Sequence, residues 1–387
     1  MNIIQPKTEQ YIVHRAVNTM FAYDGWPSVT VDENGVLYAV ASSFRMQHIC
    51  PFGKTAMYIS RDGGKTWTPP IVVNDSYLDD RDAGILYMGN GRMLVTWFNH
   101  PASFYLKQYY NSIKNAATKA EKDAILGMLE SFRQIPEEFA QGGSYIKVSE
   151  NYGVTWSDPI RIGGSAPHGP NLCGDGSLIY LGKDMYITNE ESNMAGKIRA
   201  YKSIDGGYTW NEVGTAAYPS GTLPRNFHEP HVVELPNGRL YGVIRAQNNA
   251  ADPIQPIKDG ATTPSTTRNV GYTMYTTCSD DGGKTWSEMK PMGISGAPGH
   301  LMVHSSGALI LTYSRREHPI GERALVSYDG GMTWTDEYEL TANVPYDNGY
   351  PATAELPDGS LVTVYYEKYG KDSKPSILCT KWSLQKK

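Results

Sequence analysis

The chain has 387 residues, of which 40% are hydrophobic and 19% are charged, a balance typical of a globular protein. A formal net charge of −5 argues against nucleic-acid binding, and no run of 18 apolar residues exists that could span a membrane. The N-terminus shows no basic segment followed by a long apolar run, so we expect a cytoplasmic protein unless a leader has been removed.

The composition favours many short strands joined by tight turns, since the chain contains 39 Gly, 24 Pro and 27 Tyr. The four cysteines are widely spaced, with neither a CxxC pair nor the spacing of metal ligands. We expect buried free thiols, and we predict neither a metal site nor another cofactor. These cysteines are Cys50, Cys173, Cys278 and Cys379.

Six segments, taken in chain order, each place a glycine between two apolar runs rich in β-formers. They read TVDENGVLYAVAS, LYMGNGRMLVTWF, NLCGDGSLIYLG, VVELPNGRLYGVIR, MVHSSGALILTYSR and TAELPDGSLVTVYYE. Each pattern predicts a β-hairpin. The turn glycines are Gly35, Gly91, Gly176, Gly238, Gly307 and Gly359.

A second phrase, S-x-D/N-x-G-x-T-W, follows each of the first five hairpins. It occupies residues 60–67, 149–156, 203–210, 279–286 and 327–334. We expect its Ser and Asp or Asn side chains to bond to the turn backbone, and its fifth-position Gly to adopt a positive φ. The closing Trp is predicted to fix the turn onto its own sheet.

Six units of four strands, five of them marked by this phrase, predict an all-β fold, a six-bladed β-propeller in one domain, 1–387. A strand near YIVHRAV (residues 11–17) is expected to complete the sixth blade. Residues 105–140 carry Ala, Lys, Glu and Leu at helical spacing. They predict a helical insertion between the second and third strands of blade 2.

In a propeller the first strand of each blade is innermost, so its start and the end of strand 2 share one face. The S-x-D/N-x-G-x-T-W turns lie on the other face and are predicted to be structural. Nine residues before the hairpin glycines stand Trp26, Asp82, Pro167, Glu229, Pro298 and Tyr350, with Asp24, Asp80, Arg81, His168, His228, His231 and His300 beside them. Seven to ten residues after the glycines stand Arg45, His100, Arg245, Arg315, Arg316 and Glu367. Several arginines at one mouth indicate an anionic ligand.

The repeated phrase is similar to the Asp box (BNR repeat) of the sialidase (neuraminidase) superfamily, whose fold is a six-bladed propeller. HEPHVVELPNGRLYGVIR resembles a sialidase segment and implies roles for Glu229 and Arg245. NGYPATAELPDGSLVTVYYE resembles the segment with the nucleophilic Tyr, here Tyr350, and a later Glu, here Glu367. LTYSRRE offers Arg315 or Arg316 for another family arginine.

The resemblance implies a retaining exo-glycoside hydrolase that acts on a terminal acidic sugar and needs no cofactor. A Tyr is a poor nucleophile at its usual pKa of about 10, and an adjacent carboxylate can take its proton during attack. His228 is expected to contact sugar hydroxyls, and Glu367 to orient an arginine. Trp26 is expected either to stack on a sugar or to plug the axis.

Two positions depart from the family pattern. In YDGWPS, Gly25 stands where the family has a carboxylate-binding arginine, and Arg45 or Arg81 are candidates to replace it. The loop SSFRMQHICPFGK contains no acidic residue where the family has its acid/base Asp, which leaves His48, or Asp80 or Asp82 from LDDRDAG.

Two other functions fit the same pattern. The first is a glycosidase or lyase of this fold that acts on a different sugar, for example a uronic acid. The second is a carbohydrate-binding propeller without turnover.

Overall fold

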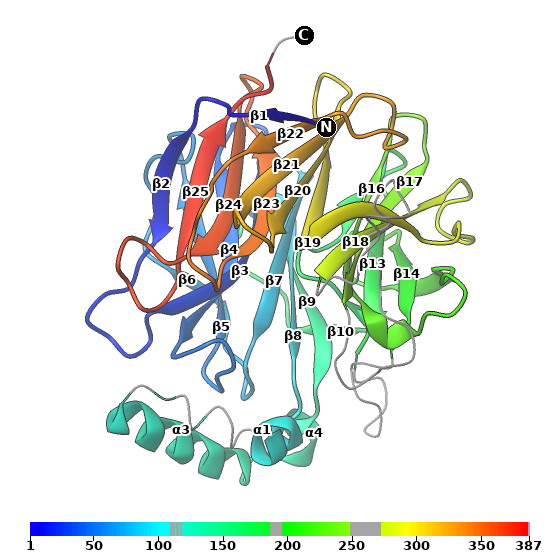
Figure 1. Cartoon of the computed structure of the whole chain (residues 1–387). Helices are drawn as coiled ribbons and strands as arrows, with labels where there is room; N and C mark the ends of the chain where they lie inside the picture. Colours follow the sequence, from blue (N-terminus) through cyan, green and yellow to red (C-terminus); the bar gives the residue numbers. More distant parts are fainter. Residues whose placement is uncertain (109–112, 114–115, 117, 186–195, 248–271, 386–387) are drawn as a thin grey trace.

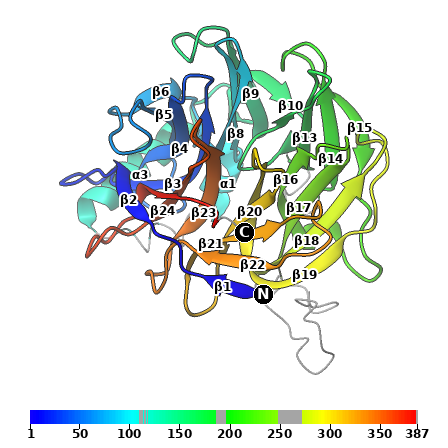
Figure 2. The same cartoon turned by 90° about the horizontal axis from the view of Figure 1, so that it is seen from above.

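The computed structural model of the chain describes all residues except 109–112, 114–115, 117, 186–195, 248–271 and 386–387. Strands dominate it, and they form five hydrogen-bonded sheets among the described residues. The sheets are distributed around the centre of the molecule, as Figure 2 shows from above. The mostly-β character predicted from the sequence is confirmed.

In the first three sheets the strands pair with their neighbours in the sequence, with one exception at β11, and all neighbouring strands are antiparallel. The first contains β3 (Tyr23–Val31), β4 (Leu37–Arg45), β5 (Lys54–Ser60) and β6 (Ile71–Asn74). The second contains β7 (Arg81–Gly89), β8 (Arg92–Asn99), β9 (Gly143–Ser149) and β10 (Ile160–Ile162). In the third, β11 (Gly164–Ser165) and β12 (Asn171–Leu172) pair with β13 (Leu178–Asp184), which is followed by β14 (Ile198–Ser203) and β15 (Asn211–Thr215).

The next seven strands and β1 form one eight-stranded sheet, because a single long strand belongs to two four-stranded groups. This strand, β19 (Lys290–Val303), pairs with β18 through its first half and with β20 through its second half. The first group also contains β16 (Phe227–Glu234), β17 (Leu240–Gln247) and β18 (Tyr272–Ser279). The second contains β20 (Leu309–Arg315), β21 (Gly321–Ser327) and β22 (Asp336–Glu339), and β1 (Asn2–Ile4) adds to β22 in parallel.

Both ends of the chain meet in the last sheet. It contains β23 (Gly349–Glu355), β24 (Leu361–Glu367) and β25 (Ser376–Trp382), and β2 (Glu9–His14) pairs antiparallel with β25. The predicted N-terminal strand is therefore confirmed. The sequence did not predict the short β1.

The first strands of the six four-stranded groups contact one another in a ring. β3 lies against β7 and β23, β12 against β7 and β16, and β19 against β16 and β23. All six predicted hairpin turns are present, and their glycines have φ between 77° and 83°, a region where a side chain would be strained. The core consists of apolar clusters between adjacent sheets.

Four of the five Asp-box turns share one hydrogen-bond pattern, and in the second, where Asn151 replaces the Asp, Asn151 Nδ2 donates to Thr155 Oγ1 at 2.9 Å. In the first, the backbone N–H of Gly64 donates to Ser60 Oγ at 2.9 Å, and Thr66 N–H and Oγ1 donate to the Asp62 carboxylate at 2.9 and 2.6 Å. The fifth-position glycines have φ between 76° and 98°. Each Trp packs in the cluster between its own sheet and the preceding one, not on its own sheet alone; these are Trp67, Trp156, Trp210, Trp286 and Trp334.

Helices interrupt the second sheet between β8 and β9, as predicted for residues 105–140. They are α1 (Ala102–Gln108), α3 (Lys119–Phe132) and α4 (Glu137–Ala140), and they lie at the end of the molecule opposite the two termini (Figure 1). Thr118 caps α3 in a capping box with Glu121. A 3₁₀ turn, η1 (Pro224–Asn226), precedes β16. None of the described helices is long and apolar enough to cross a membrane.

Candidate functional site

Four innermost strands begin with the same backbone irregularity. Trp26, Asp82, Glu229 and Tyr350 have φ between 47° and 54°, and the strand register shifts at each of them. Bulges of this kind re-aim side chains. The four positions are those found by counting nine residues back from the hairpin glycines, so that offset has a physical basis.

Tyr350, Glu229 and Arg245 meet in one cluster although they come from β23, β16 and β17. The Tyr350 hydroxyl donates to Glu229 Oε1 at 2.6 Å, and Arg245 Nη1 donates to both carboxylate oxygens at 2.6 and 2.5 Å. The same Nη1 donates to Tyr350 Oη at 3.2 Å. The phenol oxygen therefore faces a carboxylate that can accept its proton and a cation that can stabilise its anion.

Tyr350 is 6% exposed. Its burial, together with the Glu229 charge, raises the pKa of Tyr350 well above its ordinary value. The phenol is thus neutral before any reaction. The other side of Arg245 is held by Gln247 and by the ring of Tyr272, whose centroid lies 4.8 Å from the guanidinium carbon.

Asp82 lies beside this cluster and lines, together with Glu229, a pocket of about 90 Å³. Burial raises the pKa of Asp82 to about 7, with Arg81 opposing the shift and Glu229 adding to it. Its Oδ1 atom is buried without a hydrogen-bond partner. Asp82 can therefore carry a proton near neutral pH next to the reacting groups.

His228 and Lys183 line the same pocket. Burial lowers the pKa of His228 to about 2, and its Nε2 lies 2.9 Å from the carbonyl of Arg225. Lys183 was not singled out from the sequence. The count of seven to ten residues after a turn glycine, applied to Gly176, does reach it.

His48 lies at the edge of the site, where its side chain is 52% exposed. Its Nδ1 is 2.8 Å from the Tyr23 hydroxyl and 3.3 Å from Asp347 Oδ1. The ring stands edge-on to Trp26, with 5.0 Å between centroids. The Trp26 ring in turn stands edge-on to Tyr350 at 6.4 Å.

Arg45 does not reach the site, in contrast to the expectation that it binds the substrate. It is 0% exposed, it forms an ion pair with Asp79, and it donates to Ser42 Oγ at 2.9 Å and to the His48 carbonyl at 3.1 Å. Arg81 lies nearer the mouth but is 7% exposed, and its guanidinium carbon is 4.3 Å from the Trp26 ring centroid. Because Trp26 is only 1% exposed, it fills this side of the site and offers no open face for a sugar.

The two adjacent arginines of the RRE run have different surroundings. Arg316 donates to the carbonyls of Ala297 at 3.2 Å and Asn348 at 2.9 Å, which places it directly beside the start of β23. Arg315 donates instead to the carbonyls of Glu317 and His318 in its own loop. Arg316 is therefore the inward one.

Two buried carboxyl groups, Glu322 and Glu367, interact with one another, and Glu322 also interacts with Arg316. Burial raises the pKa of Glu367 to about 7, and burial together with Glu367 raises that of Glu322 to about 8, with Arg316 opposing. Glu322 lies at the start of a third strand, which the sequence count did not cover. Asp80, another acid/base candidate, is 0% exposed and accepts hydrogen bonds from Asn74, Ser76 and Asn99, so it faces away from the site.

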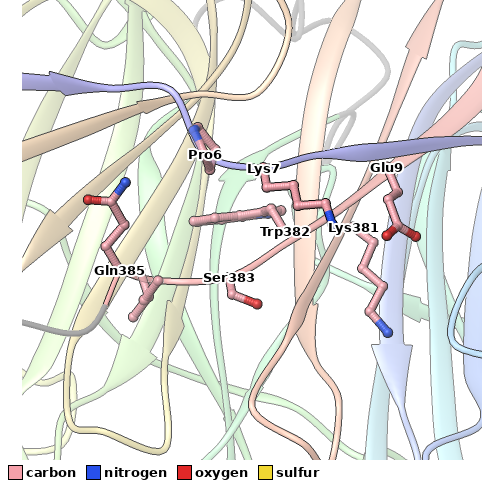
Figure 3. Close-up of a pocket in the computed structure, with 8 residues that line it drawn as sticks. Pro6, Lys7, Glu9, Lys381, Trp382, Ser383 and Gln385 are labelled. Carbon is pink, nitrogen blue, oxygen red and sulfur yellow. The ribbon is translucent and has the colours of Figure 1, made fainter.

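His231 and His300 stack on one another, His168 stands edge-on to both, and all three line a cavity of about 350 Å³ on the inner strands. Within the part of the chain that the structure describes, no group of three His, Cys, Asp or Glu side chains is arranged to hold a metal ion. A further pocket of about 410 Å³ lies near the termini, between residues 6–9 and 381–385 (Figure 3). It contains none of the predicted site residues.

Comparison with known proteins identifies the repeated turn. A model of the BNR/Asp-box repeat matches residues 58–69 and 277–288. A search of curated protein sequences finds no match. The remaining three phrases fall outside the matched residues, but they keep the same turn geometry.

Among solved structures, a protein of unknown function from Dyadobacter fermentans superposes with a TM-score of 0.72 and 19% identity over 97% of this chain and 98% of that one. The NanB sialidase of Streptococcus pneumoniae gives 0.67 and 14%, over 96% and 70%. An α-L-arabinofuranosidase from Fusarium graminearum gives 0.60 and 13%, over 98% of both chains.

The chain thus contains Asp-box repeats and has the fold shared by sialidases and this arabinofuranosidase. The resemblance to sialidases inferred from the sequence is confirmed in the repeats and in the fold. At identities below 20%, the likeness concerns the fold alone.

Proposed function

We propose that the chain is a single-domain six-bladed β-propeller, a divergent member of the sialidase superfamily, and a retaining exo-glycoside hydrolase acting on a terminal acidic sugar such as sialic acid. The observation that carries this proposal is the cluster of Tyr350, Glu229 and Arg245, in which the phenol donates to the carboxylate at 2.6 Å. The ring of contacts among the six innermost strands supports the propeller.

In the first step, Tyr350 Oη forms a bond to the anomeric carbon while the bond from that carbon to the leaving oxygen breaks. The phenol proton passes to Glu229, because a neutral phenol is a poor nucleophile. Arg245 stabilises the developing negative charge on the Tyr350 oxygen. Sialidases are the Tyr exception among retaining glycosidases, and a neutral nucleophile avoids repulsion from a sugar carboxylate.

Asp82 is the acid/base candidate that the geometry favours. It donates its proton to the leaving oxygen, and as a carboxylate it then takes a proton from the water that attacks the anomeric carbon. Tyr350 leaves and recovers its proton from Glu229, so the cycle closes. His48, held between Tyr23 and Asp347, is the second candidate for this role and lies on the far side of Trp26.

Arg316 and Arg245 are the arginines we assign to a substrate carboxylate, with His228 and Arg81 at the edge of the same site. Glu367, which interacts with Glu322, is assigned to orient an arginine, for which Arg316 is the candidate. The position in the first sheet where the family has a carboxylate-binding arginine has no replacement, because Gly25 has no charge and Arg45 is 0% exposed.

That departure favours a second candidate function, a glycosidase of the same fold for a neutral sugar. Two arginines bind a carboxylate less tightly than three, and the arabinofuranosidase from Fusarium graminearum shares the fold. A lyase or a carbohydrate-binding propeller without turnover are the other outcomes.

The test is a panel of 4-nitrophenyl glycosides of N-acetylneuraminic acid, glucuronic acid, galactose and arabinofuranose. We expect release of nitrophenol from an acidic member, with retention of anomeric configuration. Faster release from a neutral sugar would replace the acidic-sugar assignment with the second candidate. A product with a new carbon–carbon double bond would identify a lyase, and binding without cleavage would identify a binding protein.

A further inference from the structure

Lys183 is a buried cation next to the catalytic candidates that none of the proposed steps uses. It stands at the end of β13, is 3% exposed, and lines the 90 Å³ pocket together with Glu229 and Asp82. Its ammonium group donates to the carbonyl of Phe227 at 2.7 Å and to that of Pro224 at 3.1 Å. It therefore connects the third sheet to the segment that leads into Glu229.

This segment needs external support because Glu229 adopts a strained backbone conformation. Its φ is 47°, and the strand register shifts between His228 and Pro230. A non-glycine residue in this region is strained and persists only where the surroundings fix it. The bonds from Lys183 hold both ends of the short stretch that precedes this residue.

The charges around Lys183 come from three strands. Asp82 lies on β7, Asp184 on β13, and His228 and Glu229 on β16. Burial lowers the pKa of Lys183 to about 7, while Asp184 and Glu229 oppose the shift. The ammonium form is therefore present at acidic and neutral pH and is lost as the pH rises above about 7.

We propose that Lys183 is a positioning residue for Glu229: it holds residues 224–229 through two backbone carbonyls, so that the Glu229 carboxylate faces Tyr350 and Arg245. This inference rests on the proposed function. It predicts that the proton transfer from Tyr350 to Glu229 depends on an intact, charged side chain at position 183.

The experiment compares Lys183→Met, Lys183→Arg and Lys147→Met, with the melting temperature of each variant measured alongside. Lys147 is the matched control, because it also donates to a backbone carbonyl, that of Val73 at 3.1 Å, but lies outside the pocket. We expect Lys183→Met to lower kcat about tenfold to hundredfold with a smaller change in KM, as outer residues that orient a catalytic group typically do. Lys147→Met should match the wild type.

The pH profile separates positioning from a merely structural role. With a 4-nitrophenyl glycoside, whose leaving group departs without a proton, Asp82 does not limit the first step. The wild-type rate should then fall as pH rises above about 7, and Lys183→Arg, which stays charged, should recover activity and keep it to higher pH. Should Lys183→Arg not fold, the loss of this alkaline decline in Lys183→Met is the corresponding readout.

An unchanged kcat in a folded Lys183→Met variant, or an alkaline decline that Lys183→Arg and Lys183→Met both leave in place, would overturn the proposal. A wild-type chain that hydrolyses no member of the panel refutes the proposed function instead. In that case a crystal structure of Lys183→Met decides the positioning role by itself. The role stands if Glu229 turns away from Tyr350, and it falls if their hydrogen bond persists.

Discussion

The two sides of the central site differ in how closely they follow the sialidase pattern. The side formed by β16, β17 and β23 has the expected Glu, Arg and Tyr in direct contact. On the side formed by β3, β4 and β7, Trp26 fills the space, and Arg45 is buried against Asp79. The proposed nucleophile, its base and the arginine beside them thus follow the sialidase pattern, whereas the arginine and the loop acid of that pattern are missing on the other side, where Gly25 stands and Asp82 is the proposed acid.

We infer from this contrast that the residues that break the bond and the residues that bind the substrate can change independently in this fold. A nucleophile and its base need one short hydrogen bond, which two strands can supply. A carboxylate site needs several arginines from different sheets, and loss of one leaves the others free for another ligand. Four substitutions test where the boundary between the two sides lies.

The largest effect is expected for Tyr350→Phe, which removes the proposed nucleophile. We expect kcat to fall by at least about 10³-fold, because the other groups cannot form the covalent intermediate. Steady-state kinetics on the panel measures it. Tyr366→Phe is the matched control, a buried tyrosine whose ring lies 6.0 Å from that of Tyr350; equal losses in both variants would contradict the assignment.

Arg45→Met tests whether this arginine stabilises the fold instead of binding substrate. Breaking a fully buried ion pair typically costs about 3–5 kcal/mol, because the partner charge stays buried. Chemical denaturation should show such a loss, with KM of the remaining folded enzyme unchanged. Arg15→Met, which breaks the exposed pair with Asp372, should leave the free energy of unfolding nearly unchanged. A raised KM in a stable Arg45→Met variant would instead indicate that Arg45 binds the substrate.

Asp82→Asn should reduce kcat about 10²-fold on a glycoside with an alkyl leaving group, and much less on a 4-nitrophenyl glycoside that needs no proton. In the wild type, activity on the alkyl glycoside should fall as pH rises through about 7, since the acid must be protonated. Because the pKa of Asp82 is raised in the folded chain, ionising Asp82 destabilises the fold once the pH exceeds about 3.9, the pKa of an Asp in the unfolded chain. Asp82→Asn should therefore melt no lower than the wild type at pH 8. If His48→Gln shows the leaving-group dependence and Asp82→Asn does not, the acid is His48.

The smallest effect on activity is expected at Arg316, and it should distinguish this residue from its neighbour Arg315. Arg316→Met should raise KM for an acidic glycoside about tenfold, as loss of a charge-assisted hydrogen bond predicts, and leave a neutral glycoside unaffected. Arg315→Met should change neither value, because Arg315 bonds within its own loop. Equal effects of both substitutions would show that neither points to the ligand.

The parts of the fold that repeat were the parts that could be predicted from sequence. Hairpin glycines and Asp boxes are local signals, and the offset to Tyr350 and Glu229 works because a bulge recurs at the same place in several sheets. The burial of Arg45 could not be predicted this way, because an arginine at a strand end either enters the mouth or pairs with a buried carboxylate. That choice depends on Asp79, which lies 34 residues further along the chain.

Lys183 and Glu322 illustrate two different limits. Lys183 falls within the offset count and was overlooked because one lysine carries no motif. Glu322 falls outside it, and only the packing of β21 against its neighbours brings this carboxyl near Arg316. The sequence also indicates a loop at 247–269. Apart from Gln247, this loop lies outside the described residues.

The pairing of β2 with β25 has a consequence for synthesis on the ribosome. The sheet that holds Tyr350 pairs Glu9 of β2 with Lys381 of β25, so β2 lacks its partner strand until β25 has left the exit tunnel. A nascent chain that stops before Ser376 lacks the partner of both β2 and β24. Products terminated before this strand would therefore carry the tyrosine but not the finished sheet that aims it.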